Sequence, residues 1–148
     1  MNSQSPITIA LDTMSSDASS QHAIHAAAAL SITTDAPEIL LLGNEHEIGP
    51  TLDSLRHDAE NLAIFHTNTS ASALRKACEL VKEGRAEALV SAAPLSLLRN
   101  VCREMLTPIA GVQKQALGAV FPTETRRGDK ADPFSLILDI GFETQTST

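Results

Sequence analysis

Three aspartates stand where apolar runs of the sequence end and loops begin. Asp12 ends ITIALD, Asp17 closes the loop MSSD that follows it, and Asp139 ends LILD. Ligand sites of open α/β folds lie outside the carboxyl ends of the strands, so these carboxylates could form a polar cluster at such a site. The alternative is helix capping, in which a carboxylate accepts backbone N–H bonds. We favour capping for Asp17 and leave both interpretations open for Asp12 and Asp139.

Ser91 places a hydroxyl at the end of another apolar run, EALVS (87–91). There it could bind an anion or cap the helix that follows. A nucleophilic serine would need an activating base, and the sequence carries no signal for one. We therefore favour capping.

Neither the histidines nor the cysteines indicate a metal or cofactor site. His22 and His25 are spaced i, i+3, as in half of a metal site, but no acidic or thiol ligand stands at a supporting distance. Solvent-exposed histidines are the favoured interpretation. Cys78 and Cys102 fall inside helical patterns and are expected to be buried free thiols. We predict neither a metal nor a cofactor.

One compact basic cluster, formed by Arg126, Arg127 and Lys130, lies in the turn TETRRGDKADP. Arg99 and Arg103, spaced i, i+4 on a predicted helix, could extend it into a patch that docks an acidic partner. A solvated turn that improves solubility is the favoured alternative.

The elements that would position these residues alternate between strands and helices. Apolar runs predict strands at 7–11, 38–43, 61–66, 87–91, 116–122 and 134–141. Helical patterns lie at 18–31, 45–57, 70–83 and from Pro94 to just before Pro108. This order predicts an α/β fold of three layers, with a mostly parallel sheet, helices on both faces and a C-terminal antiparallel hairpin. We expect one domain over 1–148, with a polar tail from about 142.

Composition excludes several classes of partner. The net charge is −7, Trp and Tyr are absent and Phe occurs four times. A nucleic acid is not expected, because binding one needs clustered cations and stacking aromatics. The N-terminus has no signal-peptide pattern, and no apolar run approaches the length of a membrane span. These features predict a cytoplasmic protein.

Five blocks of the sequence, in one order over about 135 residues, resemble the PlsX family of phosphate acyltransferases. They are ITIALDTMSSD, LLLGNEHEI, LRKACELVKEGRAEALVSAAPLSLL, PIAGVQKQALGAVFPTE and LILDIG. The resemblance covers the N-terminal part of the family's length. It implies a role in phospholipid synthesis, where these enzymes make acyl phosphate from acyl-carrier-protein thioesters and phosphate. It also implies a set of substrate-binding positions, namely Asp12, Asp17, Ser91, Ala92, Asp139 and Gly141.

The glycine-rich turns of the family are altered here. M-G-G-D stands as MSSD (14–17), S-A-G-N-T-G-A as SAAPLSL (91–97), and L-D-x-G-A-N as LDIGFE (138–143). Glycines in such turns let the backbone approach an anion closely. We therefore expect a degenerate catalyst that acts through acyl or acyl-carrier-protein binding or through self-association. An active short phosphate acyltransferase and a vestigial scaffold are the alternatives.

The last predicted strand is strongly apolar, and no helix follows it in the sequence to cover it. It is expected either to form a sheet edge or to be covered by another chain. A homo-oligomer, or a partner chain that completes the fold, is therefore predicted beside the carrier protein.

Overall fold

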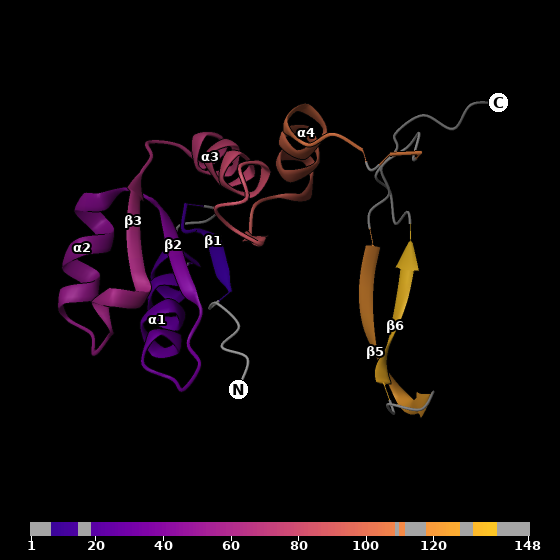
Figure 1. Cartoon of the computed structure of the whole chain (residues 1–148), viewed down its shortest axis with the longest axis horizontal. Helices are drawn as coiled ribbons and strands as arrows, with labels where there is room; N and C mark the ends of the chain where they lie inside the picture. The colour runs from indigo at the N-terminus through magenta and orange to yellow at the C-terminus, as the bar shows by residue number, and fades with distance from the viewer. Residues whose placement is uncertain (1–6, 15–18, 109, 112–117, 128–131, 139–148) are drawn as a thin grey trace. The chain divides into compact units, whose positions relative to one another are not determined.

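The computed structural model describes residues 7–14, 19–108, 110–111, 118–127 and 132–138 (Figure 1). Its contacts divide the chain into two compact units, Met1–Leu106 and Thr107–Thr148. The expectation of a single domain over the whole chain stays a prediction.

The first unit is a parallel sheet with helices on both faces. In chain order its elements are β1 (Thr8–Asp12), α1 (Ser19–Ser31), β2 (Glu38–Gly43), α2 (Glu45–Asp53), the 3₁₀ turn η1 (Ala59–Asn61), β3 (Leu62–His66), α3 (Ser70–Lys82), β4 (Ala88–Val90) and α4 (Leu95–Met105). The strands lie in the order β3-β2-β1-β4, and all three pairings are parallel. The predicted α/β fold is confirmed.

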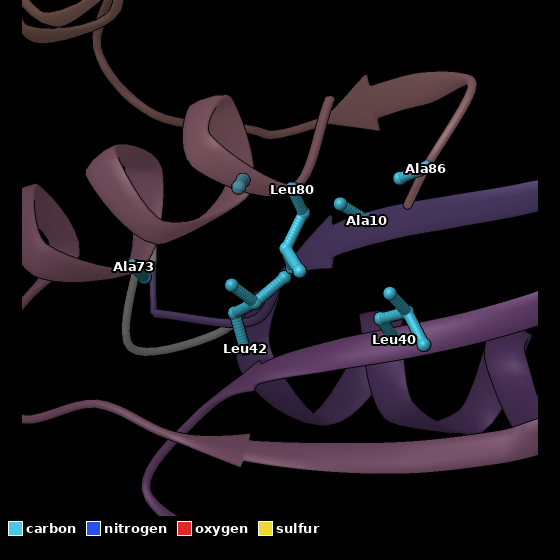
Figure 2. Close-up of a cluster of buried hydrophobic side chains, with 7 residues drawn as sticks. Ala10, Leu40, Leu42, Ala73, Leu80 and Ala86 are labelled. Carbon is cyan, nitrogen blue, oxygen red and sulfur yellow. The ribbon is translucent and has the colours of Figure 1, made fainter. Parts of the chain in front are cut away.

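Strand β2 shows why the unit has three layers. Residues Ile39 to Gly43 are all buried, because alternate side chains point to opposite faces and each face is covered. On one face Ile39 and Leu41 pack against α1 and α2. On the other, Leu40 and Leu42 pack against α3 (Figure 2). Helices α1 and α3 each contribute two alanines to this contact, which lets them lie close to the sheet: Ala27 and Ala28 from α1, and Ala73 and Ala77 from α3.

Helix α3 has clear signals at both ends. Thr69 and Ser72 form a capping box, in which each side chain accepts the backbone N–H of the other at 3.1 Å. Gly84 ends the segment with a φ of +69°, a conformation that glycine adopts without strain. Helix α4 packs on α3, and the Arg75 guanidinium donates two hydrogen bonds to the Glu104 carboxylate between them.

The second unit contains an antiparallel hairpin of β5 (Gly118–Arg127) and β6 (Asp132–Leu138). Gly118 pairs with Leu138 and Val120 with Leu136, and the register shifts between Pro122 and Arg127. The predicted hairpin is confirmed. Within the parts of the chain that the structure describes, no helix is both long and apolar enough to span a membrane.

Candidate functional site

Polar residues gather where the four parallel strands end. Asp12 is the last residue of β1 and Thr13 follows it, while Asn44 follows β2, Thr67 follows β3 and Ser91 follows β4. Strands β2 and β3 lie on one side of β1 and β4 lies on the other, so the strand order reverses between β1 and β4. Ligand sites in open parallel sheets lie at such a reversal.

A side-chain hydrogen bond spans that reversal. The Ser91 hydroxyl donates to Oδ2 of Asp12 at 2.7 Å, and Oδ1 of Asp12 accepts the Met14 N–H at 2.9 Å. The Ser91 oxygen also accepts the Ala93 N–H at 3.0 Å. Asp12 is only 3% exposed, so its carboxylate depends on protein donors. The sequence placed both residues at strand ends, and the structure brings them together.

Neighbouring polar groups hold the backbone at this edge. The Thr13 N–H and hydroxyl both donate to the Leu42 carbonyl at 3.0 Å, and the Thr67 N–H donates to the Gly43 carbonyl at 2.8 Å. A Cβ on Gly43 would lie 2.1 Å from the Thr13 hydroxyl oxygen, so a glycine is required there. The Ser70 hydroxyl donates to the Met14 carbonyl at 2.7 Å. Thr13 and Thr67 were not selected from sequence, although Thr67 directly follows a predicted strand and Thr13 lies two residues after another.

A polar cavity of about 260 Å³ opens between the ends of β1 and β2 and the helices α1 and α2. Asn44 lies at its wall, where it caps α2 by accepting the His46 N–H at 3.1 Å and donates to Glu47 at 3.0 Å. The cavity is lined by Thr13, Met14, Ser20, Ile24, Asn44, Glu47 and Ile48. Glu47 is the one charged side chain among these described lining residues. An anion in the cavity would therefore meet the Glu47 carboxylate with no cation of the described lining to compensate it.

A second, apolar pocket of about 360 Å³ lies between α3, β4 and α4. Ser91 lies at its wall, so the pocket adjoins the strand end where the Asp12 contact is made. Its remaining described lining is Cys78, Val81, Glu87, Ala88, Leu89, Leu98, Cys102 and Leu106. Burial raises the pKa of Cys78 to about 12, and burial also raises the pKa of Cys102. Both thiols are therefore protonated and uncharged at neutral pH.

The other predicted substrate positions have mixed outcomes. Ala92 follows Ser91 and is exposed. Asp17, Asp139 and Gly141 lie outside the described residues. The favoured capping role of Ser91 is wrong, because the N-cap of α4 is Pro94 and no side chain makes a capping bond there. The hydroxyl is instead directed to Asp12.

The predicted basic patch is divided between the two units. Arg99 and Arg103 lie on α4, and Nε of Arg99 is buried with no hydrogen-bond partner in the described structure. Arg126 and Arg127 are the last residues of β5, and their side chains lie outside the described part, as does Lys130. The patch therefore stays a prediction.

The two histidines of α1 lie on the surface of the first unit. His22 and His25 are exposed. Among the residues that the structure describes, no three His, Cys, Asp or Glu side chains come together as a metal site requires.

A comparison with protein families agrees with the resemblance carried by the sequence blocks. The family model described as "Fatty acid synthesis protein" matches residues 7–148, which includes both compact units. The match spans the Asp12–Ser91 contact, the polar cavity, the apolar pocket and the hairpin. The chain therefore belongs to the PlsX family of fatty acid synthesis proteins.

Proposed function

We propose that this chain is an acyl-binding member of its family that no longer transfers acyl groups to phosphate. The observation that carries the proposal is the apolar pocket between α3, β4 and α4, which adjoins Ser91 at the strand end. An acyl chain is apolar along its length and has one polar end. Its tail fits a wall of Leu89, Leu98 and Leu106, and its carbonyl would lie near the Ser91 side of the pocket.

The loss of phosphate chemistry is supported by the groups at the same edge. Pro94 stands at the start of α4 and has no backbone N–H, so it cannot donate a hydrogen bond to an anion there. Glu47, at the wall of the polar cavity, is acidic. A phosphate placed in that cavity would be repelled by the Glu47 carboxylate, because like charges disfavour each other.

Chain-length dependence tests the acyl-binding part. Each methylene buried in an apolar pocket contributes about 0.8 kcal/mol, or about fourfold in affinity. Affinity for a series of saturated fatty acids, measured by calorimetry, should rise with length and then level off once the pocket is filled. An affinity that does not change with chain length would contradict the proposal.

A pair of tryptophan variants supplies the matched control. Leu98→Trp adds bulk inside the pocket, whereas Leu95→Trp adds the same ring to the same helix at a residue that is 47% exposed and lies outside the pocket lining. Leu98→Trp should weaken acyl binding at least about tenfold, because the ring occupies the volume that the tail needs. Leu95→Trp should bind as the wild type does. Equal effects of the two variants would place the acyl chain elsewhere.

The catalytic part is tested by turnover. The purified chain should not consume an acyl-carrier-protein thioester faster when inorganic phosphate is added. Circular dichroism of the same sample verifies that it is folded. Phosphate-dependent consumption would show that the altered turns still support acyl transfer.

We also propose that an acidic acyl carrier protein docks at α4, beside the pocket. Arg99 and Arg103 lie one turn apart on this helix, and cations near a docking surface attract an acidic partner even when the chain as a whole is acidic. Arg103→Glu should weaken carrier binding in low salt, and the difference should shrink as salt is added. Arg56→Glu, a charge reversal at another exposed arginine, is the control and should have a smaller effect. Equal loss in both variants would exclude α4 as the docking surface.

Self-association is proposed through the hairpin. Leu136 and Val120 pair across the strands, lie on one face of the hairpin and are both 62% exposed. An isolated two-stranded hairpin is only marginally stable in water, so covering this apolar face would stabilise it. A second copy presents the same face, as a two-fold dimer requires. Leu136→Lys should shift a dimer to monomer in sedimentation velocity, whereas Ser135→Lys, on the opposite face, should not. A monomeric wild type at micromolar concentration would contradict the proposal.

A further inference from the structure

The two cysteines of the chain lie together between α3 and α4. Cys78 projects from α3, is 1% exposed and is packed with Leu74 and Val101, and Cys102 projects from α4 against the same cluster. The two thiols interact with each other, and both line the apolar pocket. Residues far apart in sequence and on different helices thus form a dithiol at the wall of the pocket.

Their surroundings favour a meeting of the two sulfurs. The Arg75–Glu104 pair joins the same two helices, and Arg75 lies one turn before Cys78. The helices are therefore held together next to the thiols. Cys102 is partly exposed whereas Cys78 is only 1% exposed, so a small reagent reaches Cys102 first and Cys78 second.

We propose that Cys78 and Cys102 are a redox modification site, at which a low-molecular-weight disulfide such as oxidised glutathione converts the dithiol into an interhelical disulfide. In the first step the Cys102 thiolate attacks one glutathione sulfur, which forms a mixed disulfide and releases a glutathione thiolate. In the second, the Cys78 thiolate attacks Sγ of Cys102 and releases the other glutathione. The two protons of the cysteine thiols end on the two glutathione molecules, so two thiols are oxidised and one disulfide is reduced.

The rate of this thiol–disulfide exchange depends on the fraction of each cysteine that is present as thiolate. Burial raises the pKa of both cysteines, so only a small fraction is deprotonated at neutral pH and the exchange accelerates as the pH is raised. The Cys78 side chain acts in the opposite sense on Cys102, because its hydrogen bond lowers the pKa of that thiol. This again favours Cys102 as the thiol whose thiolate attacks the glutathione disulfide first.

A disulfide here would change the part of the chain that forms the site. The segment from Cys78 to Cys102 contains β4, Ser91 and the start of α4. Joining its ends fixes α4 on α3 and draws together two walls of the apolar pocket. The dithiol would thus couple oxidation to the space available in that pocket.

Incubation of the full chain with oxidised glutathione at slightly alkaline pH, followed by intact-mass spectrometry, tests the proposal. The expected product has lost two hydrogen atoms, contains a peptide with Cys78 linked to Cys102, and returns to the dithiol on reduction. The midpoint of thermal unfolding of the oxidised form should rise by several degrees, on the order of the change that a stabilising crosslink gives a domain of this size. Cys78→Ser should stop at a mixed disulfide of glutathione on Cys102, and Cys102→Ser should leave Cys78 unmodified.

Three results in the wild-type chain would overturn the proposal, and none depends on whether a variant folds. One is a stable glutathione adduct on Cys102 with no further reaction. Another is a covalent dimer in place of the intramolecular link. The third is an unreacted native chain whose cysteines are modified once urea is added.

Discussion

Replacement of Asp12 by alanine removes the carboxylate that connects the ends of β1 and β4. Two donors then lose their acceptor, the Ser91 hydroxyl at 2.7 Å and the Met14 N–H at 2.9 Å. Because Asp12 is 3% exposed, water has little access to replace it. The substitution should therefore destabilise the fold and loosen the ends of β1 and β4, where the candidate site lies.

The magnitude follows from the two bonds. A hydrogen bond to a charged group contributes about 1.5–3 kcal/mol, so the pair gives an upper range of about 3–6 kcal/mol. Removing a buried charge offsets part of this loss. We expect Asp12→Ala to lower the free energy of unfolding by about 2–4 kcal/mol. Asp12→Asn keeps a neutral acceptor for the Met14 N–H and should lower the free energy of unfolding by about half as much as Asp12→Ala.

Urea unfolding followed by far-ultraviolet circular dichroism is the suitable assay, because the chain has no Trp or Tyr for fluorescence. Asp53→Ala, at an exposed aspartate of α2, is the control and should stay within about 0.5 kcal/mol of the wild type. A double-mutant cycle of Asp12→Ala and Ser91→Ala should give a coupling free energy of about 1–2 kcal/mol between the two side chains. The reasoning is refuted if Asp12→Ala matches the control, or if the two substitutions are additive.

Three further predictions concern the scaffold. Gly43→Ala should destabilise the fold by about 1–3 kcal/mol in urea unfolding, because its Cβ would lie 2.1 Å from the Thr13 hydroxyl oxygen. Gly49→Ala in α2 is the control and should cost less, because its Cβ meets nothing within 4 Å beyond its chain neighbours. Thr69→Ala should lower the unfolding free energy by about 1 kcal/mol through loss of the α3 cap, and an unchanged value would contradict this. Arg75 lowers the pKa of Glu104, so the ion pair stabilises above the ordinary pKa of a glutamate and is lost as the pH falls through the lowered one. Glu104→Gln should therefore lower the thermal midpoint slightly at pH 7 and not in strong acid, and an equal shift at both would argue against the pair.

Much of the first unit could be predicted from the sequence because burial leaves a simple pattern. The continuous apolar run of β2 indicates a strand covered on both faces, and the structure covers it with α1 and α2 on one side and α3 on the other. Asp12 and Ser91 were found for the same reason, since each follows an apolar run. Their mutual hydrogen bond was not, because it depends on β4 pairing with β1, with Leu11 opposite Val90.

The apolar pocket illustrates a different limit. Periodicity placed Leu98 and Cys102 on the core stripe of a helix, and both do face α3. The same two residues also line a pocket of about 360 Å³. A helical pattern shows which face is apolar, whereas the space left between helix and sheet depends on how side chains from several elements fit together.

The hydrogen bond between Asp12 and Ser91 has a structural role in holding β4 that does not require a ligand. Strand β4 is three residues long and pairs only with β1 within the described sheet, so few backbone bonds hold it. At its start the Glu87 carboxylate accepts the Thr8 N–H at 2.7 Å, and the Glu87 N–H donates to the Thr8 carbonyl at 2.9 Å. At its end the Ser91 hydroxyl donates to Asp12. The short strand is thus tied to β1 at both ends.

If the Asp12 contact serves the fold while the pocket serves binding, one substitution should separate the two. Ser91→Ala removes the hydroxyl that ties β4 to β1 but leaves a methyl group at the pocket wall. We expect it to lower the unfolding free energy by about 1–2 kcal/mol and to leave fatty acid affinity within about twofold of the wild type. Calorimetry on the folded variant measures the second quantity directly. A large loss of affinity in a stable protein would instead show that the Ser91 hydroxyl contacts the polar end of the acyl group, and its hydrogen bond to Asp12 would then be the resting arrangement of a binding residue.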